Sequence, residues 1–281
     1  MNENKYVEFS THWIYNEHTL IIKPHFNNNI NLIKFDHKII SIIFTDNLTI
    51  NNAIKNIKNY VFSICFSCSC YNKTFNYSSN KYTQNIFNCF YNKLANLFNN
   101  ILNLTFGYHF NCPVDNLPLE LIIINFDFNF NQPVNNLPHK LLNLTFSREF
   151  NQPIDNLPLT LLFLTLHYKF NQSLDNLPKT LQKLNFLNSF YFNKPVDNLP
   201  QNLQNITFNS YFNQLVDNLP YNLLFIKFGN YFNQPVDNLP HSIFDITFGD
   251  YFNQPVDNLP NSIINLIVNK KIIKRQIDKI K

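Results

Sequence analysis

The feature that most constrains this chain is a short unit, about 20 residues long, that recurs through its C-terminal half. A repeat of this length is one supersecondary unit, which cannot bury its apolar side chains alone and must stack on its neighbours. The chain is therefore expected to form a solenoid. A Phe-Asn pair opens each unit at an even spacing that lengthens once, after Phe170: Phe110, Phe130, Phe150, Phe170, Phe192, Phe212, Phe232 and Phe252. A Leu-Pro pair follows at Pro118, Pro138, Pro158, Pro178, Pro200, Pro220, Pro240 and Pro260.

One unit contains a short strand and two turn signals. In residues 130–149 the spacing Leu141-x-x-Leu144-x-Phe146 ends in strict alternation, which is typical of a strand with one buried face. Leu-Pro disfavours a helix, and the Asp-Asn pair before it can close a turn on its own backbone. Because a unit this short cannot hold a strand, two corners and an α-helix, the return side should be extended, polyproline-like or 3₁₀.

The predicted fold class is a mainly β solenoid, a right-handed coil. It has one short parallel strand per repeat of about 20–22 residues and little or no regular α-helix within the repeats. Successive strands should lie about 4.8 Å apart. The two phases of Phe in each unit should then form columns, with ring centroids about 4.5–7 Å apart.

The predicted organisation has three parts. Residues 1–97 are an N-terminal region of degenerate repeats and a cap, 98–262 are the regular array, and 263–281 are a last strand with a basic C-terminal cap. Strands upstream of the array are expected to end at Phe44, Phe66 and Phe106. The step from Phe66 to Phe106 is twice the length of one unit, and the first of the two units that it spans matches the pattern poorly.

The unit F-N-Q-P-V-D-N-L-P resembles the FNIP repeat, which is known from social amoebae and giant viruses of amoebae. The match is strong over about 110–262 and weak over 32–106. The resemblance implies a leucine-rich-repeat-like interaction module. Some members of the family carry an F-box, which couples target binding to ubiquitination. An F-box usually opens with Leu-Pro, and the first such pair here is Leu117-Pro118, inside the array.

Several enzyme classes are excluded by composition. With only 3 Gly, the chain has no Gly-rich phosphate-binding motif and no G-x-S-x-G elbow. Its His residues are scattered through the sequence. Cys65-x-x-Cys68-x-Cys70 leaves two alternatives, a soft-metal site or reduced structural thiols, and the missing second ligand pair favours thiols. We expect no enzyme activity, no catalytic residue, no cofactor and no metal.

Two polar positions recur in every unit and are interpreted as structural. The Asn of Phe-Asn should form a hydrogen-bonded ladder between coils. The Asp of Asp-Asn, which Asn135 replaces in one unit, should accept backbone N–H bonds in a turn, although a column of carboxylates could also bind calcium. Gly107, Gly229 and Gly249 each follow a strand-ending Phe, which predicts a corner with positive φ.

The outward positions of the predicted strands are the candidate binding surface. They should line the open, concave face of the sheet, where Phe163 and Phe225 would be exposed aromatic anchors. The alternative is that these positions hold surface residues compatible with β-structure. A second candidate is the insertion Leu187–Tyr191. The partner-binding candidates are Asn143, Thr145, Phe163, Thr165, Lys183, Asn185, Asn205, Thr207, Phe225 and Lys227.

The predicted function is a non-enzymatic scaffold that binds a protein partner through this face. The alternative is nucleic-acid binding through aromatic residues and the basic C-terminal tail. Residues 101–262 contain 7 basic and 12 acidic residues, a formal charge of −5, which argues against that alternative. No signal peptide or membrane span is expected, so we expect a soluble, intracellular and cytoplasmic protein. The partner's identity and the oligomeric state are not determined by the sequence.

Overall fold

The computed structural model describes residues 101–106, 110–111, 113–187 and 191–274, and only the backbone in the segments 7–10, 13–16, 19–22, 41–44 and 63–66. The chain forms two compact units. The first comprises residues 1–132 with 136–141, and the second comprises 133–135 with 142–281. The five cysteines lie outside the residues whose side chains are described, so the two alternatives for them stay open.

The first unit begins with an antiparallel meander and continues as parallel strands. Strands are present where the sequence predicts them to end at Phe44 and Phe66. β5 pairs directly with β6, and the poor unit predicted between them lies outside the described residues. The strands are β1 (Val7–Ser10), β2 (Trp13–Asn16), β3 (Thr19–Ile22), β4 (Ser41–Phe44), β5 (Ser63–Phe66), β6 (Asn103–Thr105) and β7 (Ile123–Asn125).

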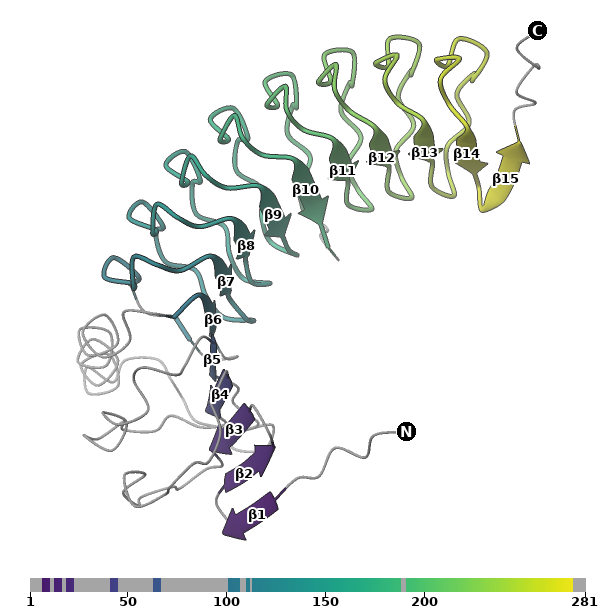
Figure 1. The fold of residues 1–281 in the computed structure, drawn as a ribbon. Helices are drawn as coiled ribbons and strands as arrows, with labels where there is room; N and C mark the ends of the chain where they lie inside the picture. Colours follow the sequence, from purple (N-terminus) through teal and green to yellow (C-terminus); the bar gives the residue numbers. More distant parts are fainter. Residues whose placement is uncertain are drawn as a thin grey trace, which may run out of the picture. The chain divides into compact units, whose positions relative to one another are not determined.

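The second unit is a stack of coils with one strand each, and its strands follow chain order along the inner, concave side (Figure 1). Parallel pairing in register runs from β8 to β14. The described residues contain no helix. The predicted β-solenoid is therefore confirmed. The strands are β8 (Asn143–Thr145), β9 (Phe163–Leu166), β10 (Lys183–Phe186), β11 (Asn205–Thr207), β12 (Phe225–Lys227), β13 (Asp245–Thr247), β14 (Asn265–Val268) and β15 (Lys271–Lys274).

The core of the second unit is built on two columns of stacked Phe rings. In one column, Phe212 lies 6.0 Å from Phe192 and 6.1 Å from Phe232, measured between ring centroids. In the other, Phe228 lies 5.6 Å from Phe208 and 5.3 Å from Phe248. These distances confirm the predicted columns. Burying each Phe contributes about 2–3 kcal/mol before the loss of conformational entropy is subtracted.

The predicted Asn ladder is present and links neighbouring coils. The backbone N–H of Asn213 donates to Asn193 Oδ1 at 2.9 Å, and that of Asn233 donates to Asn213 Oδ1 at 2.8 Å. Asn131 makes the same bond to Asn111 in the first unit. Each side-chain amide thus satisfies a backbone donor of the next coil, which explains why the unit keeps Asn after Phe.

The Asp column is structural, but its bonds differ from the predicted ones. Asp197 Oδ1 accepts from the side-chain Nδ2 of Asn218 in the next coil at 3.0 Å, and Asp217 accepts from Asn238 at 3.1 Å. Asn135 accepts from Asn156 at 3.2 Å, because an amide oxygen can replace a carboxylate oxygen here. In each Asp-Asn pair, the Asp therefore accepts a hydrogen bond from the coil that follows, and the Asn donates one to the coil before.

Asp175 has an additional partner, because Ser173 replaces the Pro of the unit. The Ser173 hydroxyl donates to Asp175 Oδ2 at 2.6 Å and accepts from the backbone N–H of Asp175 at 3.0 Å. The Ser173 hydroxyl and, to a smaller extent, the Asn198 amide hold the pKa of Asp175 below its ordinary value of 3.8. The stabilisation from this carboxylate is therefore present above about pH 4 and is lost as the pH falls through the lowered pKa.

The prediction of positive φ at the glycine corner is wrong for the described residues. Neither Gly229 nor Gly249 has a positive φ. The constraint is the close approach of neighbouring coils. A Cβ at Gly229 would lie 1.9 Å from the backbone oxygen of Asn209, and a Cβ at Gly249 would lie 2.3 Å from that of Gly229.

The strand at 265–268 is not the last strand, contrary to the prediction. β15 turns back and pairs with β14 antiparallel, with Val268 opposite Lys271. The two turn residues, Asn269 and Lys270, have φ of 49° and 64°, as a two-residue hairpin of type I′ requires. The hairpin covers the edge that β14 would otherwise expose.

Candidate interaction surface

All ten predicted partner-binding residues lie on one face of the sheet in the second unit. On each strand they flank a fully buried side chain, such as Leu164 in β9, Leu184 in β10 or Ile226 in β12. The buried side chain points into the core, so its two neighbours point to the opposite, open face. The placement of the residues matches the expectation from alternation, while their role in binding is a proposal.

The strand register arranges these residues in two rows that run across the strands. The first row holds Asn143, Phe163, Lys183, Asn205 and Phe225, and it continues to Asp245. The second row holds Thr145, Thr165, Asn185, Thr207 and Lys227, and it continues to Thr247.

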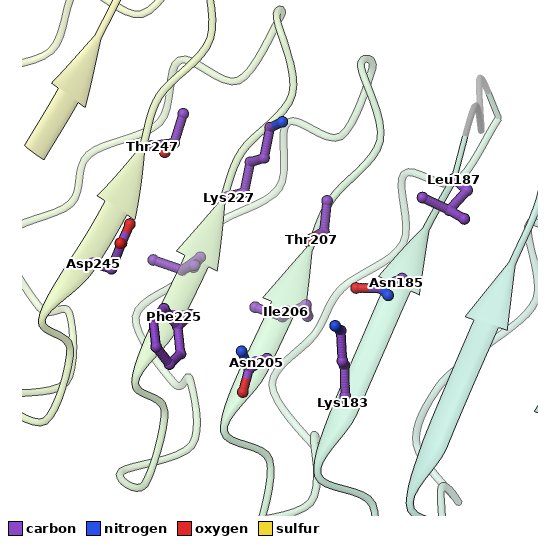
Figure 2. Close-up of a pocket in the computed structure, with 11 residues that line it drawn as sticks. Lys183, Asn185, Leu187, Asn205, Ile206, Thr207, Phe225, Lys227, Asp245 and Thr247 are labelled. Carbon is purple, nitrogen blue, oxygen red and sulfur yellow. The ribbon is translucent and has the colours of Figure 1, made fainter. Parts of the chain in front are cut away.

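An open groove of about 330 Å³ lies over β10 to β13, and we call it the β11 groove (Figure 2). Six of the ten predicted residues line it, whereas those on β8 and β9 lie outside it. Asp245 and Thr247, which are not among the ten, also line the groove, and so does Leu187, the first residue of the insertion predicted as the second candidate. The six are Lys183, Asn185, Asn205, Thr207, Phe225 and Lys227.

The groove exists because β11 carries shorter outward side chains than its neighbours. Asn205 and Thr207 are half-buried, whereas Lys183 on β10 and both Phe225 and Lys227 on β12 are exposed. Figure 2 shows the long side chains on either side of β11. The short side chains therefore form the floor and the long ones form the walls.

Two lysines without ion-pair partners give the β11 groove its charge. Lys183 and Lys227 make no ion pair with any residue that the structure describes, whereas Lys140, Lys169 and Lys270 each pair with a carboxylate of the preceding coil. The carboxylate in the groove, Asp245, accepts a hydrogen bond from Asn265 Nδ2 at 3.2 Å. The groove thus carries two cations and one anion, although the array as a whole is acidic.

Three polar side chains in the groove are available to hydrogen-bond to a ligand. The side chains of Asn185, Asn205 and Thr207 make no hydrogen bond within the described part of the chain. In the first unit, by contrast, the corresponding positions satisfy each other, since Asn125 Nδ2 donates to Thr105 Oγ1 at 3.3 Å. An amide and a hydroxyl can donate to a bound acceptor group.

The two predicted aromatic anchors are partly exposed. Phe163 is 40% exposed and Phe225 is 36% exposed. Phe225 is held by an edge-to-face contact with Phe244, with 4.4 Å between ring centroids. A partly exposed ring with a fixed orientation is a suitable contact for an apolar side chain of a partner.

A ladder of exposed tyrosines follows the corner after the strands, and the sequence analysis did not identify it. The ring of Tyr231 stacks on Tyr211 at 4.7 Å and on Tyr251 at 4.9 Å. The signal was present, because Tyr precedes the Phe-Asn pair in each of these units. Tyr231 thus has a stacked ring on both faces, whereas Tyr251, at the end of the ladder, is 60% exposed.

The described residues show no arrangement typical of catalysis or metal binding. No group of three or more His, Cys, Asp or Glu is placed to hold a metal ion in this part of the chain. The second predicted candidate, the insertion Leu187–Tyr191, is described only at its two ends, so residues 188–190 lie outside the described residues. Nor do the described segments include a helix with the length and apolar character needed to cross a bilayer.

Comparison with known families identifies the repeat. The FNIP Repeat family model matches residues 232–271, which include β13, β14 and the start of β15. Residues 232–271 are FNIP repeats. The resemblance seen in the F-N-Q-P-V-D-N-L-P unit is confirmed, and the solved structures agree with it. No curated protein sequence matches the chain.

Two solved structures share the fold of these FNIP repeats. One is CroV588, a circular leucine-rich-repeat protein of a giant virus, at 27% identity and a TM-score of 0.63 over 91% of this chain and 44% of that one. The other is a chain of the Toll–Spätzle complex of Drosophila, at 11% identity and a TM-score of 0.58 over 92% of this chain and 39% of that one. The chain thus spans less than half the length of either.

Proposed function

We propose that the chain is a non-enzymatic scaffold that binds a protein partner through the open sheet face of its second unit. The observation that carries the proposal is the β11 groove, where exposed Phe and Lys side chains surround polar donors that have no partner among the described residues. Leucine-rich-repeat-like solenoids are generally interaction scaffolds, and their concave faces are extended binding surfaces.

Nucleic-acid binding is a weaker proposal. Binding without sequence preference needs aromatic ring faces and a track of cations. Both faces of Tyr231 are occupied by Tyr211 and Tyr251, and the groove offers only two lysines, beside Asp245. Most of the basic tail, residues 275–281, lies outside the described residues.

The test is a pair of matched triple variants of the full chain. The face variant combines Phe163→Ala, Lys183→Ala and Phe225→Ala. The control combines Leu159→Ala, Lys179→Ala and Tyr221→Ala, which removes one lysine and two exposed apolar side chains from the turns after Leu-Pro. Both variants and the unmodified chain are panned against a displayed peptide library, and the bound peptides are then titrated against each protein.

Peptides selected on the unmodified chain should lose at least about tenfold in affinity for the face variant, as expected when anchor residues are truncated. They should bind the control variant unchanged. An equal loss of affinity in both variants would contradict the assigned face, and so would unchanged affinity in both. Stronger binding of single-stranded DNA than of any selected peptide, with a steep salt dependence, would favour the nucleic-acid alternative.

A further inference from the structure

The charges of the β11 groove indicate what kind of segment binds there. We propose that the groove takes an extended acidic segment of a partner protein, with carboxylates and an apolar side chain at alternate positions. This inference rests on the proposed function and names the chemistry of its partner. Its basis is the pair Lys183 and Lys227, which have no carboxylate partner among the described residues.

The two lysines stand on opposite walls of the groove. Lys183 projects from β10 and Lys227 from β12. Because Lys183 is in register with Phe225, Lys227 lies two strands across and two residues further along, about 12 Å away between backbones. Alternate residues of an extended peptide lie about 7 Å apart on one side of it. Two carboxylates at such positions can both be reached by lysine side chains, whose four-carbon stems are flexible.

The floor and one wall add contacts that suit the same segment. The side-chain donors of Asn205 and Thr207, which make no hydrogen bond to any described residue, lie between the lysines and can donate to a carboxylate or a backbone carbonyl. Phe225 stands next to Lys227 on β12 and offers a partly exposed ring to an apolar side chain. The groove therefore combines charge attraction with an apolar contact.

Asp245 limits where the acidic residues can lie. It continues the first row on β13, directly beyond Phe225, and would repel a carboxylate placed there. The acidic part of the segment should therefore lie over β10 to β12. A nucleic-acid strand has a phosphate at every nucleotide and would carry negative charge past Asp245, so a short acidic peptide fits better than a polyanion.

The experiment uses the full chain and three fluorescein-labelled peptides that differ at two positions, where the acidic and neutral peptides have side chains of nearly the same size. They are Phe-Ser-Asp-Ser-Asp, its neutral counterpart Phe-Ser-Asn-Ser-Asn and its basic counterpart Phe-Ser-Lys-Ser-Lys, together with an oligothymidylate. The groove variant carries Lys183→Glu and Lys227→Glu. The control carries Lys179→Glu and Lys194→Glu, two exposed lysines of the turns, so both variants change the net charge equally. Fluorescence anisotropy gives the affinities.

The acidic peptide should bind most tightly, and its affinity should fall on the order of tenfold in the groove variant but little in the control. Added salt should weaken its binding. Urea unfolding of both variants shows whether they remain folded. If the groove variant does not fold, Lys183→Gln with Lys227→Gln replaces it, with a smaller loss expected.

Other outcomes overturn the inference in distinguishable ways. Equal binding of the acidic and neutral peptides, or equal loss in the groove and control variants, would contradict an acidic partner but leave the proposed scaffold function intact. Lysine-dependent binding of the oligothymidylate alone would assign the groove to nucleic acid instead. If no displayed peptide binds the unmodified chain, the proposed function itself fails.

Discussion

Asn209 is an exception to the polar pairing of the solenoid. Its side chain is 2% exposed, and both Nδ2 and Oδ1 lack a hydrogen-bond partner in the described structure. The same position one coil later is Gly229, and in an earlier coil it is Ser147, which is also buried. A buried amide without partners costs about 1–3 kcal/mol, so this corner of the molecule is locally destabilised.

Replacing Asn209 by Ser should stabilise the chain. Asn209→Ser removes an unsatisfied amide and introduces a hydroxyl that can rotate toward a backbone acceptor, so we expect the free energy of unfolding to rise by about 1–3 kcal/mol in urea titrations. The matched change Asn213→Ser removes a ladder acceptor and should lower it by about 0.5–1.5 kcal/mol. A loss of stability in Asn209→Ser would show that the amide is satisfied, for instance by a buried water.

Gly229 should tolerate no side chain at all. In Gly229→Ala the new Cβ meets the Asn209 backbone, which can move only if the coils separate. We expect the free energy of unfolding to fall by at least about 1–3 kcal/mol. The neighbouring change Asn230→Ala, at an exposed position, should stay within about 0.5 kcal/mol. Similar urea midpoints for the two variants would contradict the close approach.

At the scale of the element, the turns between strands are held by bonds that each coil makes with the next. The Asp of one coil and the Asn of the following coil are paired along the second unit, as in Asn258 to Asp237 at 3.0 Å. Periodicity alone predicted a column, but not its partner. An Asp that bonds within its own turn and an Asp that bonds to the next coil recur in the sequence in the same way. Only the stacking of the coils shows which bond is made.

This bond depends on an acceptor oxygen rather than on charge. Asp197→Asn should keep the bond from Asn218, as Asn135 keeps the bond from Asn156, and should change the free energy of unfolding by less than about 0.5 kcal/mol. Asp197→Ala should cost about 0.5–1.5 kcal/mol, because the donor of Asn218 loses its acceptor. Both variants are compared by urea unfolding at neutral pH, and equal stability of the two would contradict the acceptor role.

The sequence predicted which residues of the candidate surface face outward, but it did not predict the groove that they form. Alternation with buried residues such as Leu184 and Ile206 assigns each outward position from the sequence. The groove requires the side-by-side comparison of three strands, β10, β11 and β12, that belong to successive coils. Leu187 was predicted as part of a separate insertion and not as part of this face, because it lies after the strand, outside the alternating pattern.

At the scale of the whole molecule, a solenoid has two ends that its repeats cannot protect. Each coil contacts its neighbours only, so the last parallel strand would expose unpaired backbone groups. In the second unit β15 pairs with the free edge of β14 along its whole length. The hairpin therefore caps the stack without adding another coil.

Removing the hairpin should promote association. A chain truncated after Val268 exposes the edge of β14, and we expect its apparent mass in sedimentation experiments to increase with protein concentration. A chain truncated after Lys274 loses only residues 275–281 and keeps the hairpin, so its apparent mass should match that of the full chain. The hairpin would not be the cap if both truncated chains behaved alike.

The sequence by itself determined the repeat, the strand positions, the two Phe columns and the Asn ladder. Each of these recurs at a fixed position in every unit, and stacking repeats them along the axis. Only the tertiary structure decided why Gly229 is a glycine, where Asp197 finds its partner, that β15 turns back and that a groove lies over β11. The physical reason is that these features depend on distances between neighbouring coils, which are set by how the side chains pack and which no single unit encodes.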